Sequence, residues 1–219
     1  MSDLFQPVTM EDLLGVNLYR KIGKQILFFD EESGQYVITD ISKDKKFTAD
    51  DYAKLPERAP YQLIEGKLVF EVSHTCQHQG ILGDVLLLIY RYVRENKPSE
   101  TVLTYIDVHF DKENVYQPDV IYISDKRSSI IKEYIFGAPD FTLEVLSKST
   151  EKIDRNEKMR NYGKFGVDEY WIVNPNKENI EVYHNQLGVM IHIQTAEKGK
   201  SITSKAIEGF TLNVGDVFQ

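Results

Sequence analysis

Hydrophobic residues recur along the chain at spacings that distinguish helices from strands. Between residues 79 and 95 they follow a helical period, with Ile81, Val85, Leu88 and Tyr92 about one turn apart on one face. This pattern predicts a long amphipathic helix with one side turned toward a core. A second helix is expected over residues 151–165, ending near a glycine.

Shorter apolar runs, separated by turn residues, predict strands around these helices. The strands are expected at residues 61–64, 67–72, 101–110, 117–124, 140–147, 169–175, 179–185 and 189–195. A short helix over 49–54, behind the N-cap Thr48, precedes them. The order of hairpin, helix, three strands, helix and further strands indicates an α/β fold with helices flanking a central sheet.

The first 46 residues differ from this pattern and resemble an appendage. Runs at 25–30 and 35–39 predict a β-hairpin, and a short helix is expected near residues 10–14. We therefore divide the chain into an appendage, residues 1–46, and a main domain, residues 47–219. The hairpin should pack on a sheet edge or on a partner subunit, because an exposed apolar hairpin invites association.

The composition argues against several classes of protein. The chain has 219 residues with 34 acidic and 26 basic side chains, a formal net charge of -8, which argues against binding nucleic acid through a basic face. An enzyme that meets phosphate through a metal held by carboxylates stays compatible, because such a site is itself acidic. A single cysteine excludes an internal disulfide. No apolar run approaches the roughly 20 residues of a membrane span, so we expect a cytoplasmic protein without a membrane partner.

Two carboxylates lie within apolar runs that predict buried strands. Asp119 follows Gln117-Pro118, and Glu144 lies between apolar neighbours in 140–147. A buried carboxylate is costly unless something compensates its charge. If the two strands are neighbours, the carboxylates lie about 5 Å apart and could share Mg²⁺ or Mn²⁺. Pairing with a buried lysine or arginine, or a place in water at a strand end, would be alternatives.

The helix after Glu144 carries a polar row. Asp154, Lys158 and Tyr162 are spaced at i, i+4 and i+8, which places them on one face. Two interpretations are open: a surface ion pair between Asp154 and Lys158, or a lysine directed at the acidic strand ends. In the second, its ammonium would orient a water or stabilise charge on a phosphate.

His78 precedes the long helix and forms a His-x-x-x-His spacing with His74. This segment is not convincingly helical and lacks further ligands, so we do not expect zinc. His78 is instead interpreted as a cap or as a group near the helix N-terminus, where it could also face an anion.

These residues occur in an order that resembles the Uma-type family of putative restriction endonucleases, a branch of the PD-(D/E)XK nuclease superfamily. The resemblance covers roughly residues 47–185. It rests on Tyr61-Gln62-Leu63-Ile64-Glu65-Gly66-Lys67-Leu68, His78, Gln117-Pro118-Asp119-Val120, Ala138-Pro139-Asp140, Glu144-Val145-Leu146-Ser147, Ser149-Thr150, Asp154, Lys158, Tyr162, Gly166-Val167 and Glu169-Tyr170-Trp171.

The resemblance implies a restriction-endonuclease-like fold, a mixed central sheet flanked by helices, with a Mg²⁺ or Mn²⁺ site where Asp119 and Glu144 meet. The backbone carbonyl of Val145 would assist in holding the metal. In the superfamily a lysine stands two residues after the second acid; here that residue is Leu146, and Lys158 matches the position that this family uses instead.

The chain departs from the family pattern at one position. Gln62 stands where the family often has an acid; its carbonyl oxygen can still accept or ligate, and Glu65 or Glu71 could supply the missing charge. His78, Asp154 and Tyr162 are further accessory candidates. The departure bears on catalytic competence more than on the fold.

Two functions follow from this resemblance. The first is a metal-dependent endonuclease that hydrolyses DNA, with Asp119 and Glu144 on the metal and Lys158 on the water; double-strand cleavage would favour a homodimer. The alternative is a catalytically inactive member of the fold that acts as a binding or oligomer-forming protein. Gln62 and the net acidic charge favour the alternative, and the retained Asp119, Glu144 and Lys158 favour the enzyme.

Overall fold

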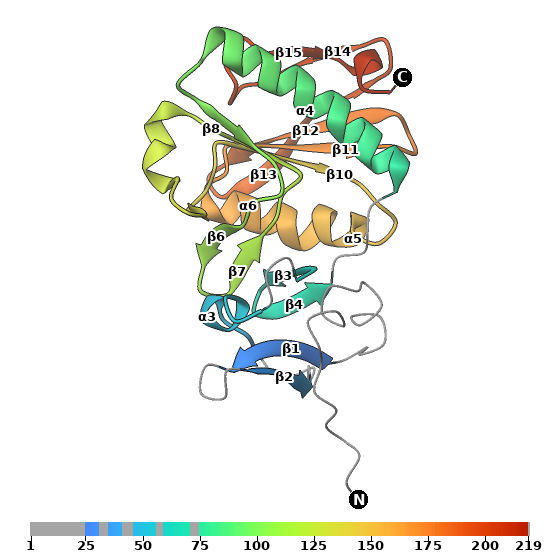
Figure 1. The fold of residues 1–219 in the computed structure, drawn as a ribbon. Helices are drawn as coiled ribbons and strands as arrows, with labels where there is room; N and C mark the ends of the chain where they lie inside the picture. The colour runs from blue at the N-terminus through green and yellow to red at the C-terminus, as the bar shows by residue number, and fades with distance from the viewer. Residues whose placement is uncertain (1–24, 31–34, 41–45, 56–58, 71–74, 219) are drawn as a thin grey trace, which may run out of the picture.

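A six-stranded mixed sheet organises the chain (Figure 1). The computed structural model describes residues 25–30, 35–40, 46–55, 59–70 and 75–218. The strand order is β13 (Val189–Glu197), β12 (Asn179–Gln186), β11 (Glu169–Asn174), β10 (Phe141–Val145), β8 (Val120–Ile123) and β5 (Thr101–Leu103). Only β10 and β11 pair in parallel, and the other neighbours are antiparallel. The predicted mixed sheet is confirmed.

Helices cover the sheet on both sides. Helix α4 (Cys76–Asn96) packs on one face, where Val85, Ile89 and Val93 are fully buried against β10 and β11. The other face holds the crossover from β10 to β11, which consists of α5 (Glu151–Ile153), the π-helix η2 (Asp154–Lys158) and α6 (Met159–Phe165). Figure 1 shows the sheet between these two layers. Because both faces are covered, the central strands are apolar almost throughout.

The remaining elements form smaller units around this sandwich. A five-stranded sheet has the order β4 (Lys67–Phe70), β3 (Tyr61–Ile64), β7 (Asn114–Tyr116), β6 (Val108–Asp111) and β9 (Ile135–Phe136). Helix α3 (Ala49–Tyr52) begins at the N-cap Thr48 as expected, and β14 (Ser201–Thr203) pairs with β15 (Thr211–Asn213). Two 3₁₀-helices are η1 (Asp125–Ile130) and η3 (Val214–Asp216).

The appendage contains the expected hairpin, in which β1 (Gln25–Asp30) pairs with β2 (Gln35–Asp40) in antiparallel register. The helix expected near residues 10–14 lies outside the described residues. How the hairpin packs stays a prediction.

Two strand predictions were wrong in their bounds. Residues 101–110 do not form one strand: β5 and β6 belong to different sheets, and between them Tyr105 adopts a left-handed conformation with φ 50°. Residues 117–124 begin as an extended connection, so Asp119 lies immediately before β8 and outside the strand. In the first case the alternation of side chains continued past Tyr105, and in the second the apolar run begins directly after Asp119, so neither pattern revealed the true bounds.

The helix predictions were closer. Helix α4 begins at Cys76, three residues before the expected start at 79, because Thr75 caps it. The segment 151–165 is helical but contains the π-helix η2, and it ends at Gly166 in a left-handed conformation with φ 92°. Among the described helices, none is long and apolar enough to cross a membrane.

Two glycines provide a matched test of this packing. A Cβ at buried Gly163 in α6 would lie 2.7 Å from the carbonyl oxygen of Gly188, so Gly163→Ala should lower the free energy of unfolding by about 1–3 kcal/mol. A Cβ at exposed Gly83 in α4 would meet nothing within 4 Å. Gly83→Ala should therefore raise the free energy of unfolding by about 0.5–1 kcal/mol. Denaturant titration followed by circular dichroism measures both, and equal effects would contradict the close approach at Gly163.

Candidate active site

Asp119 and Glu144 meet where β8 and β10 lie side by side. The antiparallel register pairs Val120 with Leu143, so the next pair outward is Asp119 opposite Glu144. Asp119 Oδ2 accepts a hydrogen bond of 2.7 Å from the Val145 amide, which fixes the carboxylate against β10. Both side chains are 4% exposed. The structure therefore brings together the two carboxylates that the sequence singled out.

Lys158 lies at the centre of the buried polar cluster. Its Nζ donates to Glu144 Oε1 at 2.9 Å and lies 3.2 Å from Asp154 Oδ1. Tyr162 also donates to Glu144 Oε1, at 2.6 Å. Lys158 is only 3% exposed, so the interpretation as a surface ion pair is wrong. The polar row of the helix faces the sheet, and the pairing of Glu144 with a buried lysine, which the sequence left open as an alternative to a shared metal, is present.

The cluster contains three buried carboxyl groups and one ammonium group. Asp119, Glu144 and Asp154 are all buried, and Lys158 is the cation that contacts two of them. Burial raises the pKa of Glu144 to about 8, outweighing the attraction of Lys158, and burial likewise raises the pKa of Asp154. A cation bound beside these carboxyl groups would stabilise their charged forms, so the electrostatics favour binding one.

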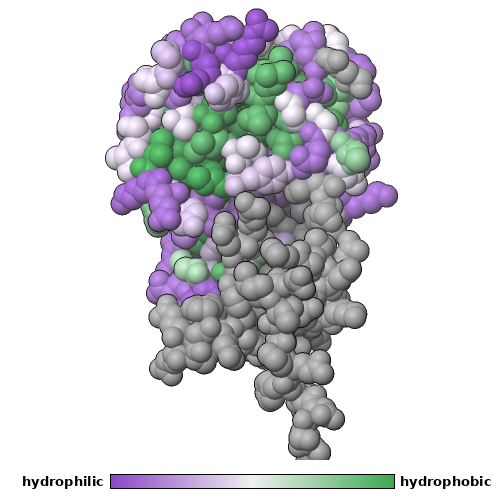
Figure 2. All heavy atoms as spheres, in the orientation of Figure 1, coloured by the Kyte–Doolittle hydropathy of each residue, from purple (hydrophilic) through white to green (hydrophobic). Residues whose placement is uncertain are grey.

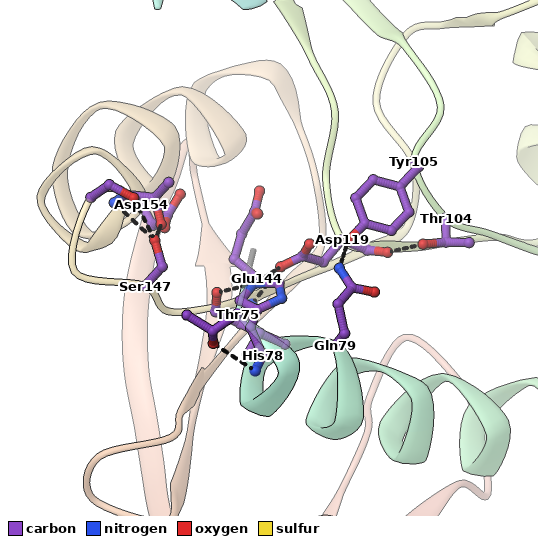
Figure 3. A network of polar contacts seen from close by, with 12 residues as sticks. Thr75, His78, Gln79, Thr104, Tyr105, Asp119, Glu144, Ser147 and Asp154 are labelled. Atoms are coloured by element: carbon purple, nitrogen blue, oxygen red, sulfur yellow. Dashed lines mark hydrogen bonds and ion pairs between the residues drawn. The ribbon is translucent and has the colours of Figure 1, made fainter. Parts of the chain in front are cut away.

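His78 reaches the same place from α4, and its interpretation as a cap was wrong (Figure 3). Thr75 is the cap: its Oγ1 accepts from the His78 amide at 3.2 Å. The His78 imidazole instead points at the sheet, with Nε2 2.9 Å from the Val145 carbonyl oxygen and 3.5 Å from Asp119 Oδ2. The carbonyl expected to assist with metal is thus in contact with His78. Thr75, three residues before His78, was the sequence signal for this placement.

The two accessory candidates at the β3–β4 hairpin lie elsewhere. Gln62 is buried, and its Oε1 accepts from the Gln117 amide at 3.0 Å, which holds the segment leading to Asp119. Glu65 occupies the turn, where it pairs with Arg160 and accepts from Asn161 at 3.3 Å. Its partners hold its carboxylate away from the buried cluster. Glu71 lies outside the described residues.

The donor set fits Mg²⁺ better than a fully protein-enclosed metal. No group of three or more His, Cys, Asp or Glu side chains converges as a metal site among the described residues. Mg²⁺ commonly takes one or two carboxylates and completes its shell with water and phosphate oxygens. Asp119 and Glu144, with the neighbouring carbonyl of Val145, supply that kind of incomplete shell. Lys158 and Tyr162 both bond to Oε1 of Glu144.

Comparisons with known proteins show the family and the fold of the chain. The sequence model of the Uma2 family, described as putative restriction endonuclease, matches residues 49–215. A solved structure of a putative nuclease belonging to DUF820 from Anabaena variabilis ATCC 29413 superposes with a TM-score of 0.64 and 22% identity, covering 78% of this chain and 97% of that one. At this identity the likeness concerns the fold. None of the curated proteins matches the chain.

The raised pKa of Glu144 makes metal affinity depend on pH. A cation competes with the proton for this carboxylate, so Mn²⁺ affinity should rise by up to about tenfold per pH unit between about pH 6 and 8, then level off. Titration calorimetry in two buffers of different ionisation enthalpy measures the affinity and the protons released. Glu144→Gln should lose most of the affinity and its pH dependence; a constant affinity across this range would contradict the assignment.

Proposed function

The chain belongs to the Uma2 family of putative restriction endonucleases, and from this membership and its acidic site we propose that it is a metal-dependent endonuclease that hydrolyses DNA phosphodiester bonds. The observation that carries the proposal is the buried cluster in which Glu144 and Asp154 share Lys158 and Asp119 lies opposite Glu144. A purely structural cluster would gain stability from hydrophobic replacement, since a buried ion pair rarely repays its desolvation. A surplus of buried carboxylates is better explained by a cation that joins them.

In this proposal Asp119, Glu144 and the carbonyl of Val145 hold Mg²⁺ or Mn²⁺. When bound, the metal would supply charge stabilisation at the phosphate and lower the pKa of a bound water. Asp119 is held ready by the Val145 amide, and Glu144 by the Tyr162 hydroxyl. Because hydrogen bonds already fix these carboxylates, their side chains need little rearrangement when the cation binds.

Lys158 acts on the reacting groups rather than on the metal. Its ammonium lies between Glu144 and Asp154, so it can orient a water for attack or stabilise negative charge on the phosphate. Asp154 is a positioning residue, since it holds the other side of the ammonium. His78 positions the β10 backbone through its contact with the Val145 carbonyl.

DNA is the proposed substrate, and a homodimer would supply the two sites needed to cut both strands. The net charge of -8 means that the protein as a whole repels phosphate. The affinity of the protein for DNA should therefore depend on bound metal, whereas a basic DNA-binding protein attracts DNA through its own side chains.

The variant Lys158→Met separates catalysis from metal binding. Cleavage of plasmid DNA at saturating Mn²⁺ should fall by roughly 10²-fold or more, because one positioned charge is lost. Mn²⁺ affinity should hold or rise slightly, since a nearby positive charge opposes cation binding. Without metal the variant should lose about 3–5 kcal/mol of stability, because two buried carboxylates lose their partner. Mn²⁺ should restore part of this loss.

Lys152→Met is the matched control, because Lys152 is exposed in the same helical segment. It should leave cleavage, Mn²⁺ affinity and stability unchanged. Equal cleavage by wild type and Lys158→Met would remove Lys158 from the mechanism. Metal binding by wild type with no cleavage of plasmid, linear duplex or single-stranded DNA would favour the alternative, a non-catalytic binding or oligomer-forming protein.

A further inference from the structure

A groove with a volume of about 380 Å³ lies on the five-stranded-sheet side of the acidic site. It is bordered by α3, by the connection between β5 and β6, and by residues next to β9. Four of its lining side chains carry rings. The side chains that matter here are Tyr52, Tyr105, Asp107, His109, Gln117 and Tyr134.

The groove adjoins the acidic site through three short connections. Gln117 lines the groove and lies two residues before Asp119. Thr104 donates to the Asp119 carbonyl oxygen at 2.6 Å, and the next residue, Tyr105, lines the groove. The Tyr105 hydroxyl accepts from Gln79, which follows His78 in α4 (Figure 3). A ligand in the groove would therefore contact the residues that lead directly to Asp119 and His78.

Tyr105 is held in an unfavourable backbone conformation. Its φ of 50° is rare for an aromatic residue and costs on the order of 1 kcal/mol or more. Despite this cost the ring is 43% exposed, so burial of the ring does not repay the strain. Strain that burial does not explain is characteristic of ligand sites.

His109 and Tyr134 form a second wall of the groove, and Phe136 stacks on His109 outside the lining. Tyr134 is 42% exposed, and Phe136 beside it is 45% exposed. His109 stacks on Phe136 with ring centroids 4.8 Å apart and lies 5.7 Å from Tyr134. Burial lowers the pKa of His109, so at neutral pH it offers an uncharged ring. Exposed rings of this kind stack on bases of any sequence.

The groove also contains a fixed hydrogen-bond acceptor. Asp107 Oδ1 accepts from Gln117 Nε2 at 2.7 Å and from the Tyr52 hydroxyl at 3.1 Å. Both donors reach the same oxygen, which leaves Oδ2 as the acceptor for an incoming donor. A carboxylate at this position suits the exocyclic amine of a base such as cytosine.

Two exposed lysines flank the cavity. Lys54 lies between the lining residues Ala53 and Leu55, and Lys132 lies two residues before Tyr134, with its Nζ 5.5 Å from the Phe136 ring centroid. Their positive charges would lie near the phosphates of a DNA strand whose base occupies the groove.

We propose that this groove binds an unstacked base of a DNA strand next to the phosphate in the acidic site. The inference rests on the proposed function and adds to it a substrate class: single-stranded DNA, or a duplex from which one base is displaced. A base with an exocyclic amine is favoured by Asp107, so cytosine binds better than thymine.

Fluorescence anisotropy with labelled eight-residue oligo(dC) and oligo(dT) tests the groove. Ca²⁺ replaces Mg²⁺ during binding, and the oligonucleotides are checked for integrity afterwards. Wild type should bind oligo(dC) about five- to tenfold more tightly than oligo(dT), the lower part of the range for one good base contact. Tyr105→Ala and Tyr134→Ala should each weaken binding of both oligonucleotides by roughly tenfold, the effect of losing one stacking ring.

Asp107→Asn tests the acceptor separately. Asparagine keeps an oxygen for Tyr52 and Gln117 but loses the charge, so the preference for oligo(dC) should fall toward one while the fold is kept. Tyr105→Phe retains the ring without the hydroxyl and should bind close to wild type. A purely structural role of these residues would move stability and leave the base preference unchanged.

Tyr90→Ala is the matched control on another face. Tyr90 is 44% exposed in α4 and lines an apolar groove with Leu87 and Leu103. Figure 2 shows hydrophobic residues gathered on the face over which α4 runs. This control should bind both oligonucleotides as wild type does. The proposal would be overturned if Tyr90→Ala weakened binding as much as the groove variants do. It would also be overturned if the Tyr105 and Tyr134 variants bound as wild type does, or if wild type bound neither oligonucleotide.

Cleavage assays distinguish this inference from the proposed function. Normal Mn²⁺-dependent cleavage with groove-independent oligonucleotide binding would overturn the base site and leave the endonuclease standing. Groove-dependent binding without cleavage by wild type would overturn the endonuclease and leave a binding site for single-stranded DNA.

Discussion

The contact of Lys158 with Glu144 and Asp154 is the interaction on which the described site depends. It links the crossover helix to the centre of the sheet and keeps two buried carboxylates from facing each other without a cation. Removing one member of such a cluster costs far more than the cluster contributes to stability, because the remaining charges stay buried. The same contact therefore holds the crossover helix in place and sets the charge that a metal meets.

The π-helix explains how Asp154, Lys158 and Tyr162 can lie on one face of the crossover helix over two turns. In a regular α-helix, residues at i, i+4 and i+8 drift around the axis, because the repeat is 3.6 residues. The wider turn of η2, which runs from Asp154 to Lys158, offsets part of that drift. Asp154 consequently stays on the same face as Lys158, and Tyr162, one regular helical turn further along α6, reaches the same oxygen of Glu144 as Lys158 does.

Much of the fold was accessible from the sequence, because burial on both faces leaves continuous apolar strands and a strong helical period. The nearness of Asp119 to Glu144 was also predictable, since both carboxylates adjoin apolar runs and one shared cation could compensate both. The burial of Lys158 was not, because helical spacing shows that residues share a face but not which face is covered. The left-handed backbone of Tyr105 ends β5 although the alternation of apolar side chains continues past it. Side-chain periodicity does not reveal such a backbone conformation. The placement of His78 near the helix N-terminus was correct, whereas the role of cap belongs to Thr75.

The glutamine at position 62 affects the charge of the site more than its geometry. Gln62 Oε1 accepts from the Gln117 amide, a bond that a carboxylate would make equally well. Gln117 in turn donates to Asp107, so the five-stranded sheet holds the segment that carries Asp119 through two successive hydrogen bonds. Replacing an acid here removes one negative charge yet keeps this support. With three buried acids still present around Lys158, the cluster retains its attraction for a cation.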